Sequence, residues 1–195
     1  MILLGLTGSI GMGKSTTAEM FAAHGDPVYD ADKAVHRLYQ GAAVDPVGEA
    51  FPDAIVDGAV DRKRLAERVL GDPVALTRLE AIVHPLVRDE EARFIAFHKD
   101  KGRRIAVLDI PLLFETGRTN LHAVVLASAP AAVQRARVLA RDGMSEDRFE
   151  AIVAKQMPDA DKRRRAHFIV ETGAGMEAAR IRVAAIRRAV LSMGK

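Results

Sequence analysis

The sequence contains no cysteine among its 195 residues. The chain therefore forms no disulfide bond and offers no thiolate to a metal ion, and this composition fits a reducing compartment. We expect a cytoplasmic protein.

The sequence also lacks any apolar run near the ~18 residues that a membrane-spanning helix requires. Its apolar start, MILLGL, has no basic segment before it and stops at TGSIGMGK, so it does not fit a signal peptide. We expect no membrane partner.

A large excess of one charge is likewise missing, because 29 lysine and arginine residues face 26 aspartate and glutamate residues, for a net charge of +3. The one dense basic run, DKRRRAH at residues 161–167, has no interleaved aromatic side chains to stack on bases. We interpret it as a solvated helix face and expect no nucleic-acid partner. The arginine-rich charge suits small anionic ligands, since the guanidinium fork matches phosphate.

What the sequence does contain is typical of a soluble globular protein, with 49% hydrophobic and 28% charged residues. Domains commonly span about 100–200 residues. We therefore expect one domain over residues 1–195, and the sequence leaves open whether it is a monomer or a small homo-oligomer.

Two kinds of pattern alternate along the chain. Short apolar runs typical of buried strands lie at residues 2–6, 27–30, 103–109, 122–128 and 167–172. Helical spacing of apolar residues marks 14–25, 31–39, 130–143, a helix beginning at Ser145, and 177–193. This alternation predicts an α/β fold with a doubly wound parallel sheet.

Residues 41–100 interrupt the alternation, because they show helical periodicity and no convincing interior strand. Helices are predicted over 61–72, 74–84 and 85–102, and a tight hairpin is predicted around Asp57–Gly58. We expect this region to form a helical lobe inserted into the α/β fold.

The stretch GSIGMGKS, residues 8–15, matches the phosphate-loop pattern G-x-x-x-x-G-K-[ST] and lies between a predicted strand and a predicted helix. Glycines permit the backbone turns that direct N–H groups at phosphate oxygens, and the start of the helix adds positive charge. Lys14 is expected to bridge the β- and γ-phosphates, Ser15 to ligate Mg²⁺, and Thr16 to lie near the α-phosphate or cap the helix. We predict that a nucleoside triphosphate with Mg²⁺ binds through Gly11, Met12, Gly13, Lys14, Ser15 and Thr16.

An aspartate ends the strand predicted at 103–109. Asp109 follows four apolar residues, which places it at the carboxyl edge of the sheet, where open α/β sheets bind their ligands. It either helps to hold the metal through a water molecule or caps the next turn, and the sequence does not decide between these roles.

Two further carboxylates, Asp30 and Asp32, follow the strand predicted at 27–30. A carboxylate at this edge can accept or orient the proton of an attacking hydroxyl, as phosphoryl transfer to an alcohol requires. Asp30 is also well placed to cap the helix that starts near Ala31. We therefore predict that Asp30 caps the helix and that Asp32 takes part in the chemistry.

Phosphoryl transfer also needs cations that close over the transferring group, commonly arginines on a mobile lid. Arg137 and Arg141 are four residues apart and are predicted to share one helix face. Arg148 follows beyond a candidate hinge at Asp142–Gly143. The alternative is a basic surface stripe paired with nearby acids, and we predict the phosphate-binding role for Arg137 and Arg141.

With these motifs the chain resembles the dephospho-coenzyme A kinases. Its segments GLTGSIGMGKST, YDADKAVHRL, EAIVHPLV and LDIPLLFE are each similar to a segment of that family. The stretch from RARVLARDGMSEDRF to AHFIVETG is similar to the family's lid and the strand after it. These matches run in order from residue 3 to residue 173 and so cover nearly the whole chain.

The resemblance implies a P-loop NTPase-type fold, similar to that of nucleoside monophosphate kinases, with ATP and Mg²⁺ as cofactors. The γ-phosphoryl group of ATP would pass to the ribose 3′-hydroxyl of dephospho-coenzyme A, the last step of coenzyme A synthesis. Lys14 would hold the phosphates, Arg137 and Arg141 would neutralise the transferring group, and Asp32 would be the base or the orienter of the hydroxyl.

The same resemblance implies where the acceptor binds. The helical insert over 32–100 would form the acceptor lobe, and residues 137–160 would form the lid. Acceptor-binding residues would be Thr7, Asp32, His84, Leu113, Phe114 and Glu115. For His84, a role in capping a turn before Pro85 stays equally open.

Two positions depart from the family pattern. The usual A-D-[YF]-V-I-x-N is AHFIVET here, with His167 for aspartate and Thr172 for asparagine. Both lie near the loop expected to face the base, so we assign base recognition to neither residue, and selectivity for ATP over GTP stays open.

Other functions remain open at this stage. A nucleoside monophosphate kinase typically has D-G-[FY]-P-R after the third strand, where this chain has DIPLLFE. A nucleotide-binding regulator or RNA-associated ATPase would use the KRRR run and hydrolyse nucleotide without an acceptor. A switch GTPase is disfavoured, because no guanine-recognising N-K-x-D string occurs.

Overall fold

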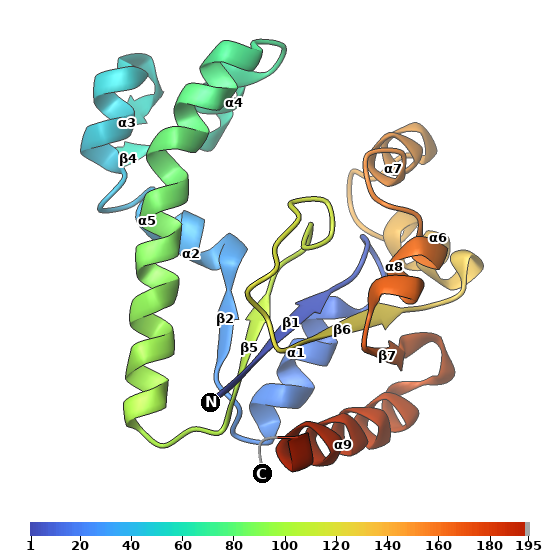
Figure 1. Cartoon of the computed structure of the whole chain (residues 1–195). Coiled ribbons are helices and arrows are strands. Elements are labelled where there is room, and N and C mark those ends of the chain that lie inside the picture. The colour runs from blue at the N-terminus through green and yellow to red at the C-terminus, as the bar shows by residue number, and fades with distance from the viewer. Residues whose placement is uncertain (194–195) are drawn as a thin grey trace. The chain divides into compact units, whose positions relative to one another are not determined.

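The computed structural model describes residues 1–193 and contains two compact units, of which the second comprises residues 30–97 and the first the rest of the chain. The first unit is built on a five-stranded sheet with the strand order β2-β5-β1-β6-β7 (Figure 1). The strands are β1 (Ile2–Thr7), β2 (Val28–Asp30), β5 (Ile105–Asp109), β6 (Ala123–Ser128) and β7 (Phe168–Glu171). The pairs β1–β5, β1–β6 and β6–β7 are parallel, so the predicted α/β fold with a parallel sheet is confirmed.

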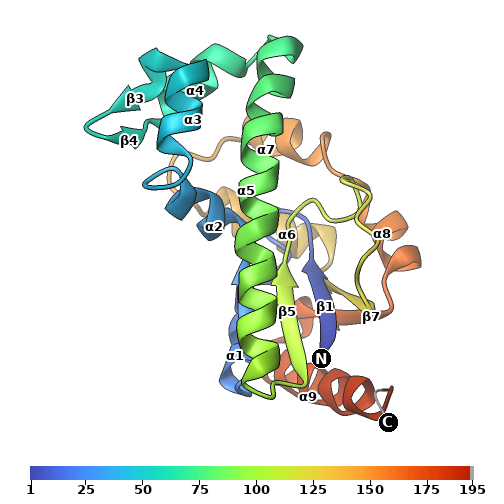
Figure 2. The same cartoon turned by 60° about the vertical axis from the view of Figure 1, so that its left-hand side comes forward.

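Two helices, α1 (Lys14–Ala23) and α9 (Met176–Met193), contact each other and pack against the sheet, as Figures 1 and 2 show. Every residue of β5 and β6 is buried, which explains why these strands are unbroken apolar runs in the sequence. The buried aliphatic side chains of the strands and both helices form one core. Arg187 on α9 also binds both carboxylate oxygens of Asp26, at 2.5 and 2.9 Å, and so ties α9 to the segment before β2.

Three shorter helices follow β6 in the first unit. They are α6 (Ala131–Leu139), α7 (Glu146–Val153) and α8 (Asp159–Arg165). Ser145 caps α7 as predicted, since its hydroxyl oxygen accepts a hydrogen bond from the Arg148 N–H. A short 3₁₀ helix, η2 (Thr172–Ala174), then joins β7 to α9.

The prediction of one helix running to Gly143 is wrong. Helix α6 ends at Leu139, and Gly143 adopts a φ of 70°, a left-handed conformation that glycine accepts at no steric cost. Arg141 therefore lies beyond the end of α6 and does not share a helix face with Arg137.

The second unit is mainly helical and has a core of its own. Apolar side chains that include Val47, Leu65 and Val83 meet in this core. Its elements are α2 (Ala31–Leu38), α3 (Val44–Ala50), η1 (Pro52–Ala54), β3 (Ile55–Val56), β4 (Ala59–Val60), α4 (Arg62–Val69) and most of α5 (Pro73–Asp100). None of the helices within residues 1–193 combines the length and the apolar character that a membrane crossing requires.

The predicted hairpin in this unit is confirmed. Strands β3 and β4 pair antiparallel, and the two residues between them, Asp57 and Gly58, have φ angles of 50° and 75°. Positive φ at both central residues is the geometry of the tightest hairpin turns.

Helix α5 corrects the prediction of two helices that meet at His84–Pro85. It is one helix of 28 residues with Pro85 inside it. A proline removes one backbone hydrogen bond, but Leu79 and Val83 are buried in the core just before it and hold the helix in place. His84 is exposed within the continuous helix, so it does not cap a turn.

Candidate active site

The phosphate loop begins at the carboxyl end of β1 and leads into α1. Gly11 and Gly13 have φ angles of 74° and 84°, a conformation that L side chains rarely adopt. A Cβ on Gly11 would lie 2.4 Å from Val138 Cγ2, and one on Gly13 would lie 2.9 Å from Thr172 Oγ1. Conformation and space therefore both require glycine at these positions, and successive N–H groups of such a loop can surround a phosphate.

Lys14, the first residue of α1, is paired with Asp109 at the end of β5. The Lys14 Nζ lies 2.6 Å from Asp109 Oδ1, and the Asp109 side chain is only 4% exposed. The structure thus brings together the lysine predicted to hold the phosphates and the carboxylate predicted at the sheet edge.

Ser15 and Asp109 carry side-chain oxygen atoms of the kind that binds Mg²⁺. Ser15 is exposed in the first turn of α1, and Asp109 ends the strand beside β1. Mg²⁺ is commonly bound by one or two protein oxygens together with the phosphates of its nucleotide, and this donor set fits that mode. Within residues 1–193 no group of three or more His, Asp or Glu side chains is arranged to hold a metal by itself.

Two glutamines hold the phosphate loop at Ile10. The Gln134 side-chain amide donates to the Ile10 carbonyl at 2.8 Å, and Gln156 Oε1 accepts from the Ile10 N–H at 3.2 Å. Gln134 is a buried residue of α6, and Gln156 lies between α7 and α8. The carbonyl and the N–H of Ile10 are therefore both held by residues that follow β6 in the chain.

Arg137 is the predicted lid arginine that the structure places against the phosphate loop. Its Nη1 donates to Thr172 Oγ1 at 2.9 Å, and its Nη2 donates to the Thr172 carbonyl at 2.8 Å. Arg141 is exposed after the end of α6. Arg148 instead donates to the Gly143 carbonyl at 3.3 Å.

The loop after β5 contains most of the other predicted acceptor residues. Thr7, fully buried at the end of β1, donates its hydroxyl to the Pro111 carbonyl of this loop at 3.0 Å. Leu113, predicted at the mouth of the acceptor site, is 1% exposed and packs among buried residues. Phe114 is half-buried, and the neighbouring Leu112 is exposed.

Glu115, the last predicted acceptor residue, is held by the segment from Met157 to Lys162. Its Oε1 accepts a hydrogen bond from the Met157 N–H at 2.8 Å and lies 2.9 Å from Lys162 Nζ. Burial alone would raise the pKa of the Glu115 carboxyl, but hydrogen bonds from Lys162 and Met157 outweigh burial and hold this pKa below its usual range.

The basic run at 161–167 is not simply a solvated helix face, so that prediction is wrong for Lys162. The Lys162 side chain is 0% exposed, and within the described residues no group other than Glu115 reaches its ammonium. Arg163 in the same run binds Glu171 at 2.5 Å. A good part of the charge of this run is therefore balanced inside the chain.

Asp30, the last residue of β2, and Asp32, in α2, have different roles in the second unit. Asp30 caps α2 as predicted, because its Oδ1 accepts a hydrogen bond from the Lys33 N–H at 3.0 Å. Asp32 lies in the first turn of α2, and its side chain is exposed. The capping task therefore falls to one aspartate and leaves the carboxylate of the other at the surface.

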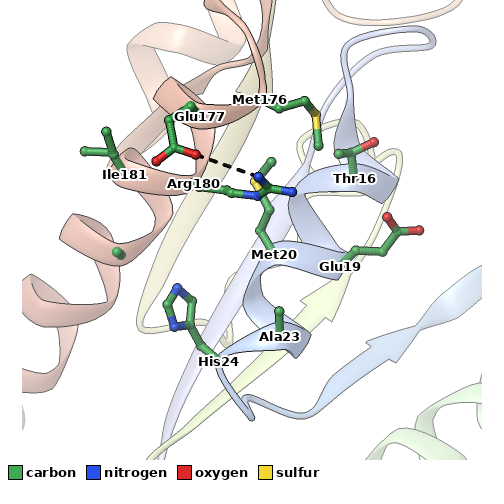
Figure 3. A pocket seen from close by; sticks show the side chains of 10 residues that line it. Thr16, Glu19, Met20, Ala23, His24, Met176, Glu177, Arg180 and Ile181 are labelled. Atoms are coloured by element: carbon green, nitrogen blue, oxygen red, sulfur yellow. Dashed lines mark ion pairs between the residues drawn. The ribbon is translucent and has the colours of Figure 1, made fainter.

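A groove of about 550 Å³ lies between α1 and α9, and Figure 3 shows the side chains that line it. Thr16 and Met176 lie at one end, and Met20 lies between the two helices. Glu177 and Arg180 form an ion pair of 3.7 Å along its edge. Thr16 is the one predicted nucleotide-binding residue in its lining, so this groove runs beside the phosphate loop and does not contain it.

Sequence reasoning missed several residues that hold this site, namely Gln134, Gln156 and Lys162. A glutamine on a helix or a lysine in a basic run carries no sign of burial or of a distant partner. The one available signal was position, because all three lie within or next to the long stretch that resembles a kinase lid.

Comparisons with known proteins identify the family of the chain. A family model described as dephospho-CoA kinase matches residues 2–177 of the chain. The dephospho-CoA kinase of Mesorhizobium japonicum is 63% identical over 187 residues, which cover 95% of each chain.

Two solved structures have a similar fold. TT1252 from Thermus thermophilus has a TM-score of 0.84 and 37% identity, with 96% of each chain covered. Dephospho-CoA kinase from Campylobacter jejuni has a TM-score of 0.67 and 23% identity, again over 96% of each chain, a likeness that concerns the fold.

Proposed function

The chain belongs to the dephospho-CoA kinase family, and on that premise we propose that it transfers the γ-phosphoryl group of ATP to the ribose 3′-hydroxyl of dephospho-coenzyme A. The products are coenzyme A and ADP, so the reaction is the last step of coenzyme A synthesis. The observation that carries the ATP-binding part of the proposal is the phosphate loop, in which Gly11 and Gly13 shape the backbone beside the ammonium group of Lys14, and the choice of acceptor follows from the family.

ATP binds through its phosphates to the loop residues Gly11, Met12, Gly13, Lys14, Ser15 and Thr16. The loop N–H groups and the start of α1 attract the phosphate oxygens. Lys14 exchanges its present partner Asp109 for the phosphates and bridges the β- and γ-phosphates. Ser15, and Asp109 through water, would hold Mg²⁺, which neutralises phosphate charge when bound.

Asp32 acts on the acceptor. Its carboxylate accepts or orients the proton of the 3′-hydroxyl while the hydroxyl oxygen bonds to the γ-phosphorus. The bond from the γ-phosphorus to the β–γ bridging oxygen breaks, and ADP leaves with that oxygen. Because the transition state is loose, Asp32 contributes by orienting the hydroxyl as well as by its basicity.

Arg137 and Arg141 carry positive charge to the phosphoryl group, and residues 137–160 act as the lid that excludes water. The lobe of residues 32–100 receives the acceptor, with His84 as a contact.

The loop after β5 completes the acceptor site. Phe114 contacts the acceptor directly, because its half-buried ring keeps free surface. Thr7, Leu113 and Glu115 also belong to the acceptor site, and each in addition holds the loop in shape through its contacts with the protein.

The substrates are therefore small molecules, and a chain without cysteine fits the reducing cytoplasm, where we place the reaction.

The proposal is tested by measuring ADP release with Mg-ATP and a panel of acceptors that includes dephospho-coenzyme A, AMP, UMP, a sugar and no acceptor. We expect stimulation by dephospho-coenzyme A alone. If AMP or UMP stimulates ADP release, the protein is still a kinase but its acceptor is a nucleoside monophosphate. If ADP is released at the same rate with every acceptor and with none, a nucleotide-binding regulator is favoured.

A further inference from the structure

Thr172 occupies the turn between β7 and α9 and joins two parts of the nucleotide site. Its hydroxyl donates to the Met12 carbonyl at 2.8 Å and accepts from Arg137 Nη1 at 2.9 Å. Its backbone carbonyl accepts from Arg137 Nη2 at 2.8 Å. One threonine thus contacts the phosphate loop and a guanidinium group from α6 at the same time.

The contact between Thr172 and the phosphate loop is close. A Cβ on Gly13 would lie within 2.9 to 3.0 Å of the Thr172 side chain, so glycine at position 13 is what lets the two segments touch. A hydroxyl has one hydrogen to donate, and the Thr172 hydrogen is used on Met12. An asparagine amide, the group of the family pattern at this position, likewise offers both a donor and an acceptor, so the threonine retains both hydrogen-bonding capacities in a smaller side chain.

The partners of Arg137 are neutral oxygens, namely the hydroxyl and carbonyl oxygens of Thr172 and, at 3.5 Å, the Gly11 carbonyl of the phosphate loop. Within the described part of the chain its guanidinium forms no ion pair, whereas Arg135 two residues earlier pairs with Glu146 and Arg163 pairs with Glu171. Neutral partners fix the orientation of a guanidinium without cancelling its charge. A guanidinium held in this way next to the phosphate loop is prepared for an anionic ligand.

We propose that Thr172 is a positioning residue, whose hydroxyl holds the Arg137 guanidinium against the phosphate loop so that its charge acts on the bound nucleotide. The inference rests on the proposed function, in which Arg137 serves ATP. In this role Thr172 acts through Arg137.

The test compares Thr172→Val, which has nearly the same shape without the hydroxyl, with Thr172→Ser, which keeps the hydroxyl. Thr119→Val, at an exposed threonine of the loop before β6, is the matched control. We expect Thr172→Val to lower kcat/KM for ATP about tenfold, because the variant loses the hydroxyl's hydrogen bond to the charged Arg137 together with its neutral one to the Met12 carbonyl. Thr172→Ser and Thr119→Val should keep the value of the unaltered enzyme.

A double variant distinguishes two roles of Thr172, namely holding the Arg137 guanidinium in position and supporting the phosphate loop directly. If Thr172 acts through Arg137, Thr172→Val should have little further effect in an Arg137→Ala background. If its effect is instead the same with and without Arg137, or if Thr172→Val behaves like the unaltered enzyme, the inference is overturned. Thr172→Ala repeats the comparison with a smaller side chain, and thermal unfolding checks that each variant is folded.

Measuring the binding of an ATP analogue tests the inference without assuming which acceptor the enzyme uses. The dissociation constant of a non-hydrolysable ATP analogue, measured by calorimetry on the same variants, requires no acceptor. The same non-additivity between Thr172 and Arg137 should appear there, and additive losses would contradict the inference. A failure of dephospho-coenzyme A to stimulate ADP release would contradict only the proposed function.

Discussion

The Lys14 ammonium lies 2.6 Å from Asp109 Oδ1, where the carboxylate is almost entirely buried. The phosphate-binding lysine is thus held at the end of β5 by the same carboxylate that we propose as a metal-site residue. Under the proposed function, Lys14 would exchange Asp109 for the phosphates and Asp109 would exchange Lys14 for the metal site, so both charges would stay compensated when the nucleotide binds.

Lys14→Ala should abolish turnover, because no other residue of the loop brings a cation to the phosphates. It should also destabilise the fold by about 3 kcal/mol, since it removes the ammonium that compensates a buried carboxylate. The double variant Lys14→Ala/Asp109→Asn should recover much of this stability and none of the activity. Thermal unfolding and ADP release measure the two effects, and recovered turnover in the double variant would contradict the role of Lys14.

Asp32→Asn should lower kcat by a factor of about 100 or more, the usual contribution of a general base, and should leave the dissociation constant of ATP nearly unchanged. Asp30→Asn is the matched control, because asparagine caps a helix as well as aspartate does. Steady-state kinetics with dephospho-coenzyme A and ATP give both values. An unchanged kcat in Asp32→Asn would remove this residue from the chemistry.

The pH dependence of stability should report the Glu115–Lys162 pair. The pKa of Glu115 is lower in the folded protein than in the unfolded chain, so its stabilising effect is complete above its unfolded pKa of about 4.3. That effect is lost as the pH falls through the lower folded pKa. The difference in unfolding free energy between the unaltered protein and Glu115→Gln should therefore be largest near neutral pH and shrink below about pH 4. A difference that is independent of pH would contradict the ion pair.

Gly11→Ala should abolish ATP binding, because the added methyl group would lie 2.4 Å from Val138 Cγ2. Gly102→Ala is the control for backbone strain alone. Gly102 also has a positive φ, of 71°, but a Cβ at this position would meet no atom within 4 Å. The control should lose only about 1–2 kcal/mol of stability and keep its affinity for ATP. Equal losses of affinity in both variants would show that the packing at Gly11 is unimportant.

Local features of this chain could be predicted from the sequence. The caps at Asp30 and Ser145 and the turn at Asp57–Gly58 depend on residues that are neighbours along the chain. The buried strands were equally clear, because a strand covered on both faces must be apolar throughout. The phosphate loop belongs to the same class, since its glycines and lysine act within eight consecutive residues.

Features that depend on distant partners could not be predicted. Lys162 lies in a run of charged residues, which in the sequence looks like an exposed helix face. Its burial depends on the ion pair with Glu115, which comes from the loop after β5. The near-complete burial of Leu113 was equally hidden, because its loop sequence alone does not show which of its leucines packs inward. Pro85 should break a helix by its own chemistry, but buried neighbours within α5 keep that helix continuous.

The central claim is tested most directly by incubating the protein with dephospho-coenzyme A and with ATP labelled on its γ-phosphate. The account predicts that the label appears in coenzyme A, as a phosphate ester at the ribose 3′ position, in amounts equal to the ADP formed. Label found only in inorganic phosphate, or in a different position of the product, would contradict it.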